Sequence, residues 1–505
     1  MGEILSRLVV GFGLVMAIQP ILMIFFGVTL GIILGALPGL TATMGVAILM
    51  PLTFFMEPIP GISFLLGVYC GGIYGGSITA ILIKTPGTPS AAATLLDGYP
   101  LAQKGQALKA LEMALYASVI SGLISSFMLI FVAPPLASIA LRFGPPEYFA
   151  LGLFGLTIVA TVSGKELVKG LIAASIGLLF SFIGLDPIAG SPRLTFGIVN
   201  LQSGIELIPA LIGLFAVGEV MVQTEQSWAK AVHAIKVTGE RLKLQELREC
   251  MFTIIRSSLI GTFIGAVPGT GAGVSAFVSY NEAHRTSKRR KEFGEGCLEG
   301  VAAAEAGNNG VTGATLIPLL TLGIPGDSVT AVLLGALMVQ GLTPGPMIFQ
   351  KSGDIIFGIF AGLILCNIVM LIVGYLGVKI FYKVTAVQPY LLYPVIFALC
   401  SVGAFAVNTR LSDVYIMLFF GLLGYVMQKF GFPTAPVLLA LILGPLTESN
   451  LRRGLVATRG NIAAFLFRPL TMVFLLISVA SIVFFIAREA LEARKIGRQA
   501  QKQAN

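Results

Sequence analysis

Apolar residues run along this chain in long blocks that are separated by short polar segments. A helix needs about 20 apolar residues to cross a bilayer, and several of these blocks are shorter than that. Strand-like alternation is absent over these lengths, so helices are favoured over a barrel. The pattern predicts an all-α polytopic membrane protein with roughly 10–13 transmembrane helices and some half-crossings. The blocks cover 8–35, 40–55, 59–83, 107–132, 146–162, 167–185, 205–222, 251–268, 300–323, 327–342, 355–383, 389–407, 411–428, 433–447 and 462–487.

Composition agrees with this pattern. Of the 505 residues, 56% are hydrophobic and 11% are charged, whereas soluble domains carry about 25% charged residues. So few charges cannot cover a water-facing surface, which excludes a cytosolic enzyme, a disordered chain and a disulfide scaffold. The five cysteines form no close pair in the sequence and only two histidines are present. We therefore expect no metal site and no cofactor.

The chain carries a net charge of +9, and many of its Lys and Arg residues lie in three polar segments, 223–250, 284–295 and the tail from Arg488. Clusters of Lys and Arg beside membrane spans mark the cytoplasmic side, which explains them without a nucleic-acid partner. The loop 448–459 also carries three arginines, and its side stays open. The first block reads as a retained span because no small-residue cleavage signal follows a short apolar core.

Two motifs occur twice at long spacing. Segments 35–41 and 265–271 read GALPGLT and GAVPGTG, an offset of 230 residues, while segments 85–91 and 324–330 read TPGTPSA and IPGDSVT, an offset of 239. Such self-similarity indicates an internal repeat. Glycines at four-residue spacing also recur, and on a helix they let another backbone approach closely. These are Gly27, Gly31 and Gly35, with Gly71/Gly75 and Gly72/Gly76.

Charge in the matched loops suggests that the two repeats are inverted. The basic loop 284–295 corresponds to 55–61, which has no Lys or Arg. Opposite bias at matched positions is typical of the inverted repeats of secondary transporters, although a parallel repeat stays the alternative. We expect a first transmembrane repeat at 1–222, a cytoplasmic polar connector at 223–250, a second repeat at 251–460, a final transmembrane helix at 461–487 and a basic cytoplasmic tail at 488–505.

Each repeat contains a Pro-Gly break inside apolar sequence, at Thr85–Ser90 and at Gly323–Ser328. Proline removes a backbone donor, and glycine permits a sharp reversal. The stretch Ser90–Leu96, about 10 Å as a helix, is too short to cross the bilayer. The breaks therefore predict paired re-entrant hairpins that stop at mid-depth, and two ordinary kinked helices are the alternative.

The residues after each break resemble helix starts. Thr88 and Asp327 are good N-caps, and Pro89 suits a first helical turn. Free N–H groups at a helix N-terminus attract anions, and broken helices in transporters hold carboxylates in this way. The residues expected to bind an anionic substrate are Thr85, Pro86, Gly87, Thr88, Ser90, Asn308, Asn309, Pro325, Gly326, Asp327 and Ser328.

A second group of polar residues lies beside the breaks and could hold a cation or the substrate. Buried hydroxyls and amides need partners, which a ligand, a neighbouring helix or their own backbone can supply. A carboxylate at membrane depth is a functional candidate by default. This group comprises Thr41, Thr43, Ser77, Thr79, Thr270, Ser275 and Glu305. No catalytic and no metal-ligating residue is expected.

GALPGLT, TPGTPSA and the segment EAGNNGVTGATLIPLLTLGIPGDSVTA at 305–331 resemble the large membrane (permease) subunit of the bacterial tripartite tricarboxylate transporters, the TctA family. The likeness covers about residues 20–450. It implies a multi-pass permease of the bacterial inner membrane, working with a small membrane subunit and a periplasmic solute-binding protein. It also implies import of a carboxylate such as citrate, driven by an ion gradient that is usually sodium.

Two other classes of function stay open. An intramembrane aspartyl protease would need Gly-x-Gly-Asp, and Gly323–Asp327 has one residue too many between its glycines. No nucleophile elbow, P-loop or HExxH occurs. A channel or passive scaffold would more often show a symmetric selectivity ring. The choice of carboxylate, the ion stoichiometry, homo-oligomer formation and an elevator-type motion stay open.

Overall fold

The computed structural model describes residues 2–37, 39–162, 167–186, 189–226, 235, 237–384, 392–483 and 486–487. The expected basic tail 488–505 and much of the connector at 227–236 lie outside the described residues. The chain forms two compact units, Met1–Leu141 with Leu211–Leu422, and Arg142–Ala210 with Leu423–Asn505. The units follow spatial contacts and not the repeat boundaries, so the boundaries drawn from the sequence stay a prediction.

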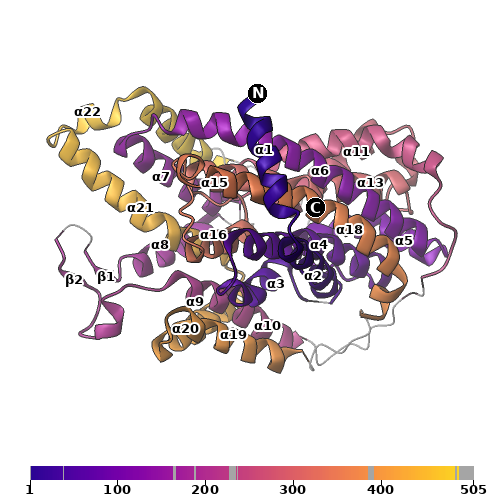
Figure 1. Cartoon of the computed structure of the whole chain (residues 1–505), viewed down its shortest axis with the longest axis horizontal. Helices are drawn as coiled ribbons and strands as arrows, with labels where there is room; N and C mark the ends of the chain where they lie inside the picture. The colour runs from indigo at the N-terminus through magenta and orange to yellow at the C-terminus, as the bar shows by residue number, and fades with distance from the viewer. Residues whose placement is uncertain are drawn as a thin grey trace, which may run out of the picture. The chain divides into compact units, whose positions relative to one another are not determined.

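Unit one is helical and contains every residue that the sequence analysis singled out for binding. Its short turns are η1 (Met50–Thr53), η2 (Pro89–Ala92) and η6 (Arg290–Glu292), and a π-helical turn, η4 (Gly213–Val217), joins α9 to α10. Its helices, with α9 and α20 crossing into unit two, are α1 (Gly2–Val15), α2 (Ile18–Gly35), α3 (Ala42–Leu49), α4 (Pro58–Ile83), α5 (Leu95–Gln103), α6 (Ala107–Ala140), α9 (Leu207–Ile212), α10 (Gly218–Gln226), α11 (Leu244–Gly265), α12 (Gly271–Thr286), α13 (Leu298–Asn309), α14 (Val311–Ala314), α15 (Leu316–Leu322), α16 (Ser328–Val339), α17 (Ile348–Lys351), α18 (Gly353–Val384), α19 (Tyr393–Asn408) and α20 (Leu411–Lys429) (Figure 1).

Unit two packs α21 against α7 and α8. Between α8 and α9, Gly184 pairs with Arg193 in a two-residue antiparallel ladder. Ion pairs join Arg193 to Glu448 at 2.6 Å and Arg452 to Asp186 at 2.9 Å, which ties this ladder to α21. The elements are α7 (Pro145–Val162), α8 (Leu167–Ser181), β1 (Gly184–Leu185), β2 (Pro192–Arg193), η3 (Val199–Leu201), α21 (Ala435–Ala457), α22 (Ile462–Leu466) and a helix at Pro469–Val483.

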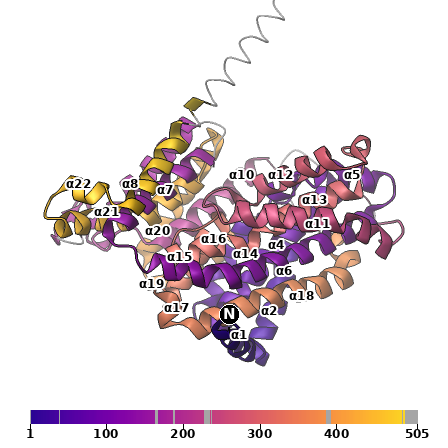
Figure 2. The same cartoon turned by 90° about the horizontal axis from the view of Figure 1, so that it is seen from above.

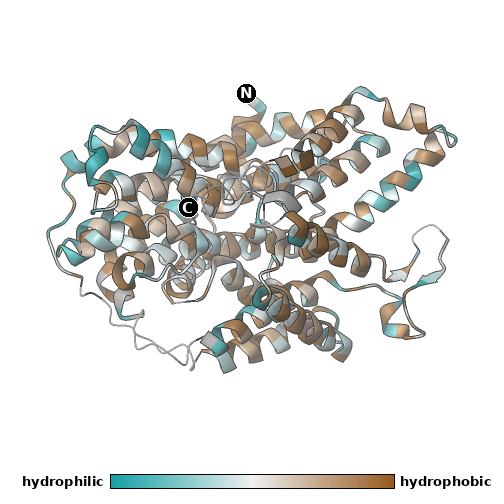
Figure 3. Ribbon diagram, turned by 180° about the vertical axis from the view of Figure 1, so that it is seen from behind, coloured by the Kyte–Doolittle hydropathy of each residue, from teal (hydrophilic) through white to brown (hydrophobic). Residues whose placement is uncertain are grey.

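Helix dominates the described residues, and apolar residues, coloured brown on the ribbon in Figure 3, predominate along most helices. This confirms an all-α polytopic membrane protein. Within the described chain, 6 helices are long and apolar enough to cross a membrane, and shorter apolar helices accompany them. The total of roughly 10–13 crossings stays a prediction. The six are Ile18–Gly35, Pro58–Ile83, Ala107–Ala140, Leu207–Glu225, Gly353–Val378 and Leu411–Lys429.

Three segments differ from the pattern of apolar blocks. The first block, 8–35, contains two helices and not one, because Ala17 is extended and α2 begins at Ile18 with Pro20 in its first turn. The block 300–323 is divided into α13, α14 and α15. The expected loop 448–459 is mostly helical, since α21 continues to Ala457 and Arg452 pairs with Glu448 one turn away.

Two of the predicted glycine stripes form the contact between α2 and α4, whereas Gly72 and Gly76 face Ala42 and Thr88. A Cβ atom at Gly27, Gly31 or Gly35 would collide with a backbone carbonyl of α4, and one at Gly71 or Gly75 would collide with a carbonyl of α2. The two backbones are therefore in direct contact, which only glycine permits. This packing places α4 in the interior, where it carries the residues described below.

We predict that Gly31→Ala lowers the melting temperature of the detergent-solubilised protein. The added Cβ would lie 2.5 Å from the Val68 carbonyl oxygen, a backbone atom that cannot move aside, and such overpacking costs about 1–3 kcal/mol. Gly13→Ala on α1 is the matched control, because nothing lies within 4 Å of its Cβ position. Equal melting temperatures for the two variants would contradict the close contact of α2 and α4.

Candidate functional site

Helix α4 is the element on which the candidate site is built. Every residue of α4 from Pro60 to Ile83 is buried. It packs against α2, α3, α6 and α18 (Figure 2). Polar side chains on such a helix have no access to bulk water, so each must find a partner inside the protein or in a ligand.

The first elbow, which is the Pro-Gly break at Thr85–Ser90, begins where α4 ends. Lys84 is in the left-handed conformation with φ 59°, its side chain is exposed, and residues 85–88 lead into the single 3₁₀ turn η2. Gly87 donates its N–H to the Gly76 carbonyl at 3.3 Å, and a Cβ on Gly87 would collide with the Gly35 carbonyl. Pro89 takes the first position of η2, as expected, but the regular helix α5 begins only at Leu95.

The second elbow, which is the Pro-Gly break at Gly323–Ser328, joins α15 to α16. Gly323 ends α15 with φ 74°, and Asp327 caps α16. The Asp327 carboxylate accepts hydrogen bonds from the Thr330 N–H at 2.8 Å and from the Tyr69 hydroxyl at 2.9 Å. The Gly326 carbonyl accepts from the Gly269 N–H at 2.8 Å. The capping role of Asp327 is confirmed, and its carboxylate already neutralises part of the positive end of α16.

The two elbows contact the same face of α4. Thr88 lies against Gly76, and Asp327 is bound by Tyr69. Gly76 and Tyr69 are seven residues apart, two helical turns or about 10 Å along the axis. Residues seven apart on a helix share a face. The sequence motifs, 239 residues apart, are therefore brought to neighbouring places on one buried helix.

The elbows also make corresponding contacts. Gly87 packs on Gly76, and Gly326 packs on Thr315. Gly87 and Gly326 are 239 residues apart, and so are Gly76 and Thr315. This is the same offset as the one between the two motifs. The other repeated motif takes part as well, since Gly87 lies against Gly35 and the Gly326 carbonyl is bound by Gly269.

Glu305 is a fully buried carboxylate with a shell of hydroxyl groups. Its Oε1 accepts from Ser77 at 2.5 Å and also from Thr94, and its Oε2 accepts from Ser118 at 3.0 Å. These groups come from α4, from the segment after η2 and from α6. Among the described residues, no Lys or Arg pairs with Glu305. Among the described residues, hydroxyl groups and not a cationic side chain therefore satisfy the Glu305 carboxyl group.

Two buried amides next to Glu305 have unsatisfied atoms. Neither Nδ2 nor Oδ1 of Asn308 has a hydrogen-bond partner among the described residues, and Oδ1 of Asn309 also lacks one. The Asn309 Nδ2 donates to the Ser118 hydroxyl at 2.8 Å. Asn308 is fully buried, with an exposed fraction of 0%. An unpaired buried amide costs about 1–3 kcal/mol, so these atoms are good candidates for ligand contacts.

The remaining candidate residues differ in their hydrogen bonds and in their burial. Hydroxyls that already bond to backbone have less freedom to bind a ligand: Thr41, Thr79, Thr85 and Thr270 bond to backbone close by in the sequence, and Ser275 donates to the Gly307 carbonyl of α13 at 2.6 Å. Thr88 and Ser90 share a hydrogen bond of 2.8 Å between their hydroxyls. Pro325 is buried, Pro86, Thr43 and Ser328 are half-buried, and Thr85 is exposed.

Sequence reasoning missed Tyr69, Thr94, Ser118 and Thr315. Tyr69 and Thr315 share a contact of 3.4 Å between their hydroxyl oxygens beside Asp327, and Thr94 and Ser118 bind Glu305. They lie outside the Pro-Gly motifs, so the motifs could not identify them. Hydroxyl groups within otherwise apolar runs were the available signal.

Asp97 fastens α5, the helix that follows the first elbow. Its Oδ1 accepts from the N–H groups of Gly294, Gly296 and Cys297, and its Oδ2 accepts from the Tyr280 hydroxyl at 2.9 Å. Burial raises the pKa of the Asp97 carboxyl, while these hydrogen bonds act in the opposite direction. Asp97 thus joins α5 to the loop that precedes α13, the helix of Glu305.

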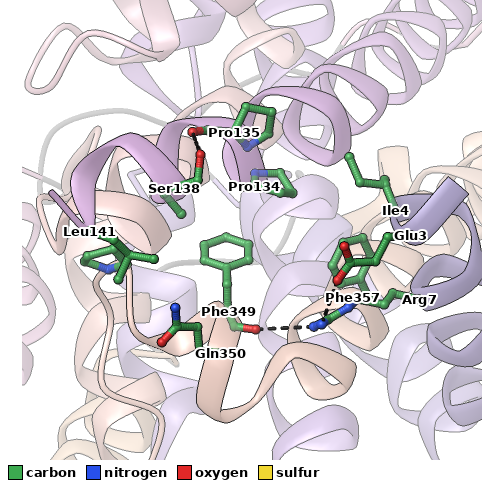
Figure 4. A pocket seen from close by; sticks show the side chains of 12 residues that line it. Glu3, Ile4, Arg7, Pro134, Pro135, Ser138, Leu141, Phe349, Gln350 and Phe357 are labelled. Atoms are coloured by element: carbon green, nitrogen blue, oxygen red, sulfur yellow. Dashed lines mark hydrogen bonds and ion pairs between the residues drawn. The ribbon is translucent and has the colours of Figure 1, made fainter. Parts of the chain in front are cut away.

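A pocket of about 360 Å³ lies elsewhere in unit one, between α1, the end of α6 and the segment at α17 (Figure 4). Arg7 points toward Glu3 and donates to the Phe349 carbonyl at 3.4 Å. Pro134 and Phe357 provide apolar walls. None of the residues predicted to bind substrate lines this pocket.

Comparison with known proteins assigns the family. The pattern that defines the tripartite tricarboxylate transporter TctA family matches residues 21–439. The chain belongs to the TctA family. It is therefore a large membrane subunit of a tripartite tricarboxylate transporter, a class of system that also comprises a small membrane subunit and a periplasmic binding protein. Both elbows and Glu305 lie inside the matched range.

Two curated relatives from Agrobacterium vitis are similar to this TctA-family chain. One, described as an uncharacterized 52.8 kDa protein in the TAR-I ttuC' 3' region, is 36% identical over 483 residues, which are 96% of each chain. The other, from the TAR-II ttuC' 3' region, is 37% identical over 210 residues, 42% of this chain and 87% of that protein. No solved structure matches the chain.

We predict that Tyr69→Phe destabilises the protein by about 1–3 kcal/mol, because the Asp327 carboxylate would lose a buried donor. Tyr74→Phe is the matched control, since the Tyr74 hydroxyl is buried five residues further along α4 and has no partner among the described residues. Its removal should be neutral or stabilising. Thermal unfolding in detergent measures both, and an equal shift would mean that the bond from Tyr69 to Asp327 contributes nothing.

Proposed function

We propose that the chain is the permease of a secondary active transporter that imports a di- or tricarboxylate anion, with citrate as the example, across the bacterial inner membrane. The periplasmic binding protein delivers the anion, and a cation gradient, taken to be sodium, drives its uptake. Family membership supports the system type. The observation that supports the mechanism is that two Pro-Gly elbows, far apart in the sequence, rest on one face of α4.

The proposed architecture has two inverted repeats, each with a re-entrant hairpin. Its support is the repeated motif pair, the opposite loop charges and the corresponding contacts of Gly87 and Gly326. The offset of 239 residues also relates Tyr69 to Asn308 and Asp327 to Thr88. Because Tyr69 binds the second elbow at Asp327, the corresponding residue Asn308 should face the first elbow at Thr88. This accounts for an amide that is buried without a protein partner.

The anion in this proposal is held by the first elbow and by the Asn308 amide. The first elbow has no acidic side chain between Lys84 and Thr94, and its N–H groups are donors suited to a carboxylate. The carboxylates of Asp327 and Glu305 would repel an anion in direct contact. They are suited instead to the cation that accompanies it, with Ser77 and Asn309 as further oxygen ligands.

Reconstitution tests the proposed function. The permease is placed in proteoliposomes with its small membrane subunit, and its binding protein and radiolabelled citrate are added outside. An inward sodium gradient should drive citrate to a higher concentration inside than outside. Flux that only follows the citrate gradient would indicate a channel. No flux in the presence of all three components would indicate a scaffold and would contradict the proposal.

Asn308→Ala tests the substrate site. Among the described residues the Asn308 side chain has no hydrogen bond to lose, so the melting temperature should be unchanged or higher. Citrate uptake should fall about tenfold or more, the effect of losing a buried polar contact to substrate. Asn367→Ala is the control, because Asn367 is buried on α18 and its Nδ2 donates within its own helix, to the Leu363 carbonyl. Normal uptake by Asn308→Ala would remove this residue from the site.

A further inference from the structure

The pocket between α1, the end of α6 and α17 lies at one surface of the membrane. Helix α6 begins among charged residues, where Lys109 pairs with Glu246 at 2.7 Å. Its 34 residues correspond to about 51 Å, which exceeds the hydrocarbon core of about 30 Å. The pocket therefore lies at the headgroup level of the leaflet opposite to Lys109. The residues of α6 that line it come from the last two turns and the C-cap: Pro134, Pro135, Ala137, Ser138 and Leu141.

Apolar side chains form most of the wall of this pocket, which has a volume of about 360 Å³ (Figure 4). Ile4 of α1 and Phe357 of α18 contribute to it together with the end of α6. Next to lining residues in the sequence, the large apolar side chains of Leu5, Ile139 and Met347 are exposed. Because exposed apolar side chains of a membrane protein contact acyl chains, the pocket is bordered by residues that face lipid.

Two charged residues of opposite sign also line the pocket. Glu3 and Arg7 are one turn apart on α1, and their side chains pair at 3.0 Å. The Glu3 side chain is 77% exposed, and an exposed ion pair contributes only about 0–1 kcal/mol. Arg7 also donates to the Phe349 carbonyl of α17 at 3.4 Å, beside the apolar wall (Figure 4). Both charges can therefore exchange a weak pairing for contacts with a ligand.

The size and the lining of the pocket restrict what can occupy it. A cube of this volume has an edge of about 7 Å, whereas a helix with its side chains is about 10–12 Å across, so a transmembrane helix of another subunit does not fit inside. A carboxylate substrate would meet apolar walls and the Glu3 carboxylate. A water molecule takes about 30 Å³ in the liquid, and a CH₂ group is of similar size. Roughly a dozen CH₂ groups of an acyl chain therefore fit.

We propose that this pocket binds a phospholipid with an ethanolamine headgroup. The phosphate contacts the Arg7 guanidinium, whose N–H groups suit phosphate oxygens, and the ammonium group contacts the Glu3 carboxylate. One acyl chain fills the apolar space between Pro134 of α6 and Phe357 of α18. The headgroup thus carries the two charges that Glu3 and Arg7 complement, whereas an anionic headgroup would satisfy Arg7 alone and be repelled by Glu3.

The bound lipid holds α1 on the rest of unit one. Helix α1 has 14 residues, about 21 Å, and cannot cross the hydrocarbon core by itself. It packs against α18, which in turn packs against α4 and α6. A lipid in the pocket touches α1, α6, α17 and α18 together. Because a ligand that binds only the folded state stabilises it, the lipid should raise the melting temperature. Lipid binding is separate from citrate transport, so failure of the proposed function would leave it intact.

The test uses the full-length permease, purified in detergent and depleted of lipid. Dioleoyl phosphatidylethanolamine, dioleoyl phosphatidylglycerol or dioleoylglycerol is added, and these three share their acyl chains but differ in the headgroup. Native mass spectrometry measures the bound lipid, and thermal unfolding measures its effect. The phosphatidylethanolamine should bind most tightly and raise the melting temperature most, since its headgroup matches both charges. Equal binding and equal shifts with all three would mean that the headgroup is not recognised, and would overturn the proposal.

Variants of the two charged residues locate the lipid. Arg7→Gln should weaken phosphatidylethanolamine binding about tenfold or more, the effect of losing a hydrogen bond between charged groups. Glu3→Gln should reduce the preference for phosphatidylethanolamine over phosphatidylglycerol. Without lipid, both variants should melt close to the unaltered protein, because an exposed ion pair contributes little.

Arg285→Gln is the matched control, since Arg285 is an exposed arginine that pairs with Glu282 at 2.9 Å on α12, outside the pocket. It should bind phosphatidylethanolamine like the unaltered protein. Equal lipid binding by Arg7→Gln and Arg285→Gln would remove the lipid from this pocket. Loss of the bound lipid on addition of the small membrane subunit would assign the pocket to that subunit, and would also contradict the proposal.

Discussion

The contact between α2 and α4 is the constraint on which the rest of the arrangement depends. Glycines on both helices bring the two backbones into direct contact. Helix α4 can therefore be buried on all sides without a break in its helical structure. A buried helix offers a rigid surface on which other segments can be placed with little freedom. Gly76 of α4 receives the first elbow, and Gly35 of α2 closes it from the other side. Gly35 thus takes part both in the packing of α2 against α4 and in the contact with the first elbow.

Burial on this scale makes each polar group on or near α4 costly unless it is satisfied. Within the described part of the chain, Asp327 and Glu305 are satisfied without cationic side chains, through hydroxyl groups from α4, from α6 and from the elbow segments. A fixed ion pair would hold a carboxylate permanently in its charged form. A hydroxyl shell can instead reorient when a proton or cation arrives, because hydroxyl groups both donate and accept. This choice of partners suits a protein that must change state.

Much of the architecture could be predicted from the sequence because its causes are local. Apolar blocks indicate membrane helices, four-residue glycine spacing indicates close helix packing, and Pro-Gly pairs indicate breaks. The partners of Glu305 and Asp327 could not be predicted in this way, since Thr94, Ser118 and Tyr69 come from segments that approach only in three dimensions. The first apolar block is a different case, because the break at Ala17, just before the first turn that holds Pro20, is local but is not visible in hydrophobicity alone.

The two elbows differ in charge at corresponding positions, and this difference restricts how an anion can be held. The second elbow has Asp327, whose carboxylate accepts the nearest N–H groups of α16. The first elbow has Thr88 at the corresponding position. Its uncharged hydroxyl group forms a hydrogen bond with the Ser90 hydroxyl. Because like charges repel in a medium of low dielectric, an anion between the elbows would lie nearer to the first, and a cation nearer to the second. Repetition of the motif thus supplies two similar frames, and the change from Thr88 to Asp327 makes the two elbows differ in charge.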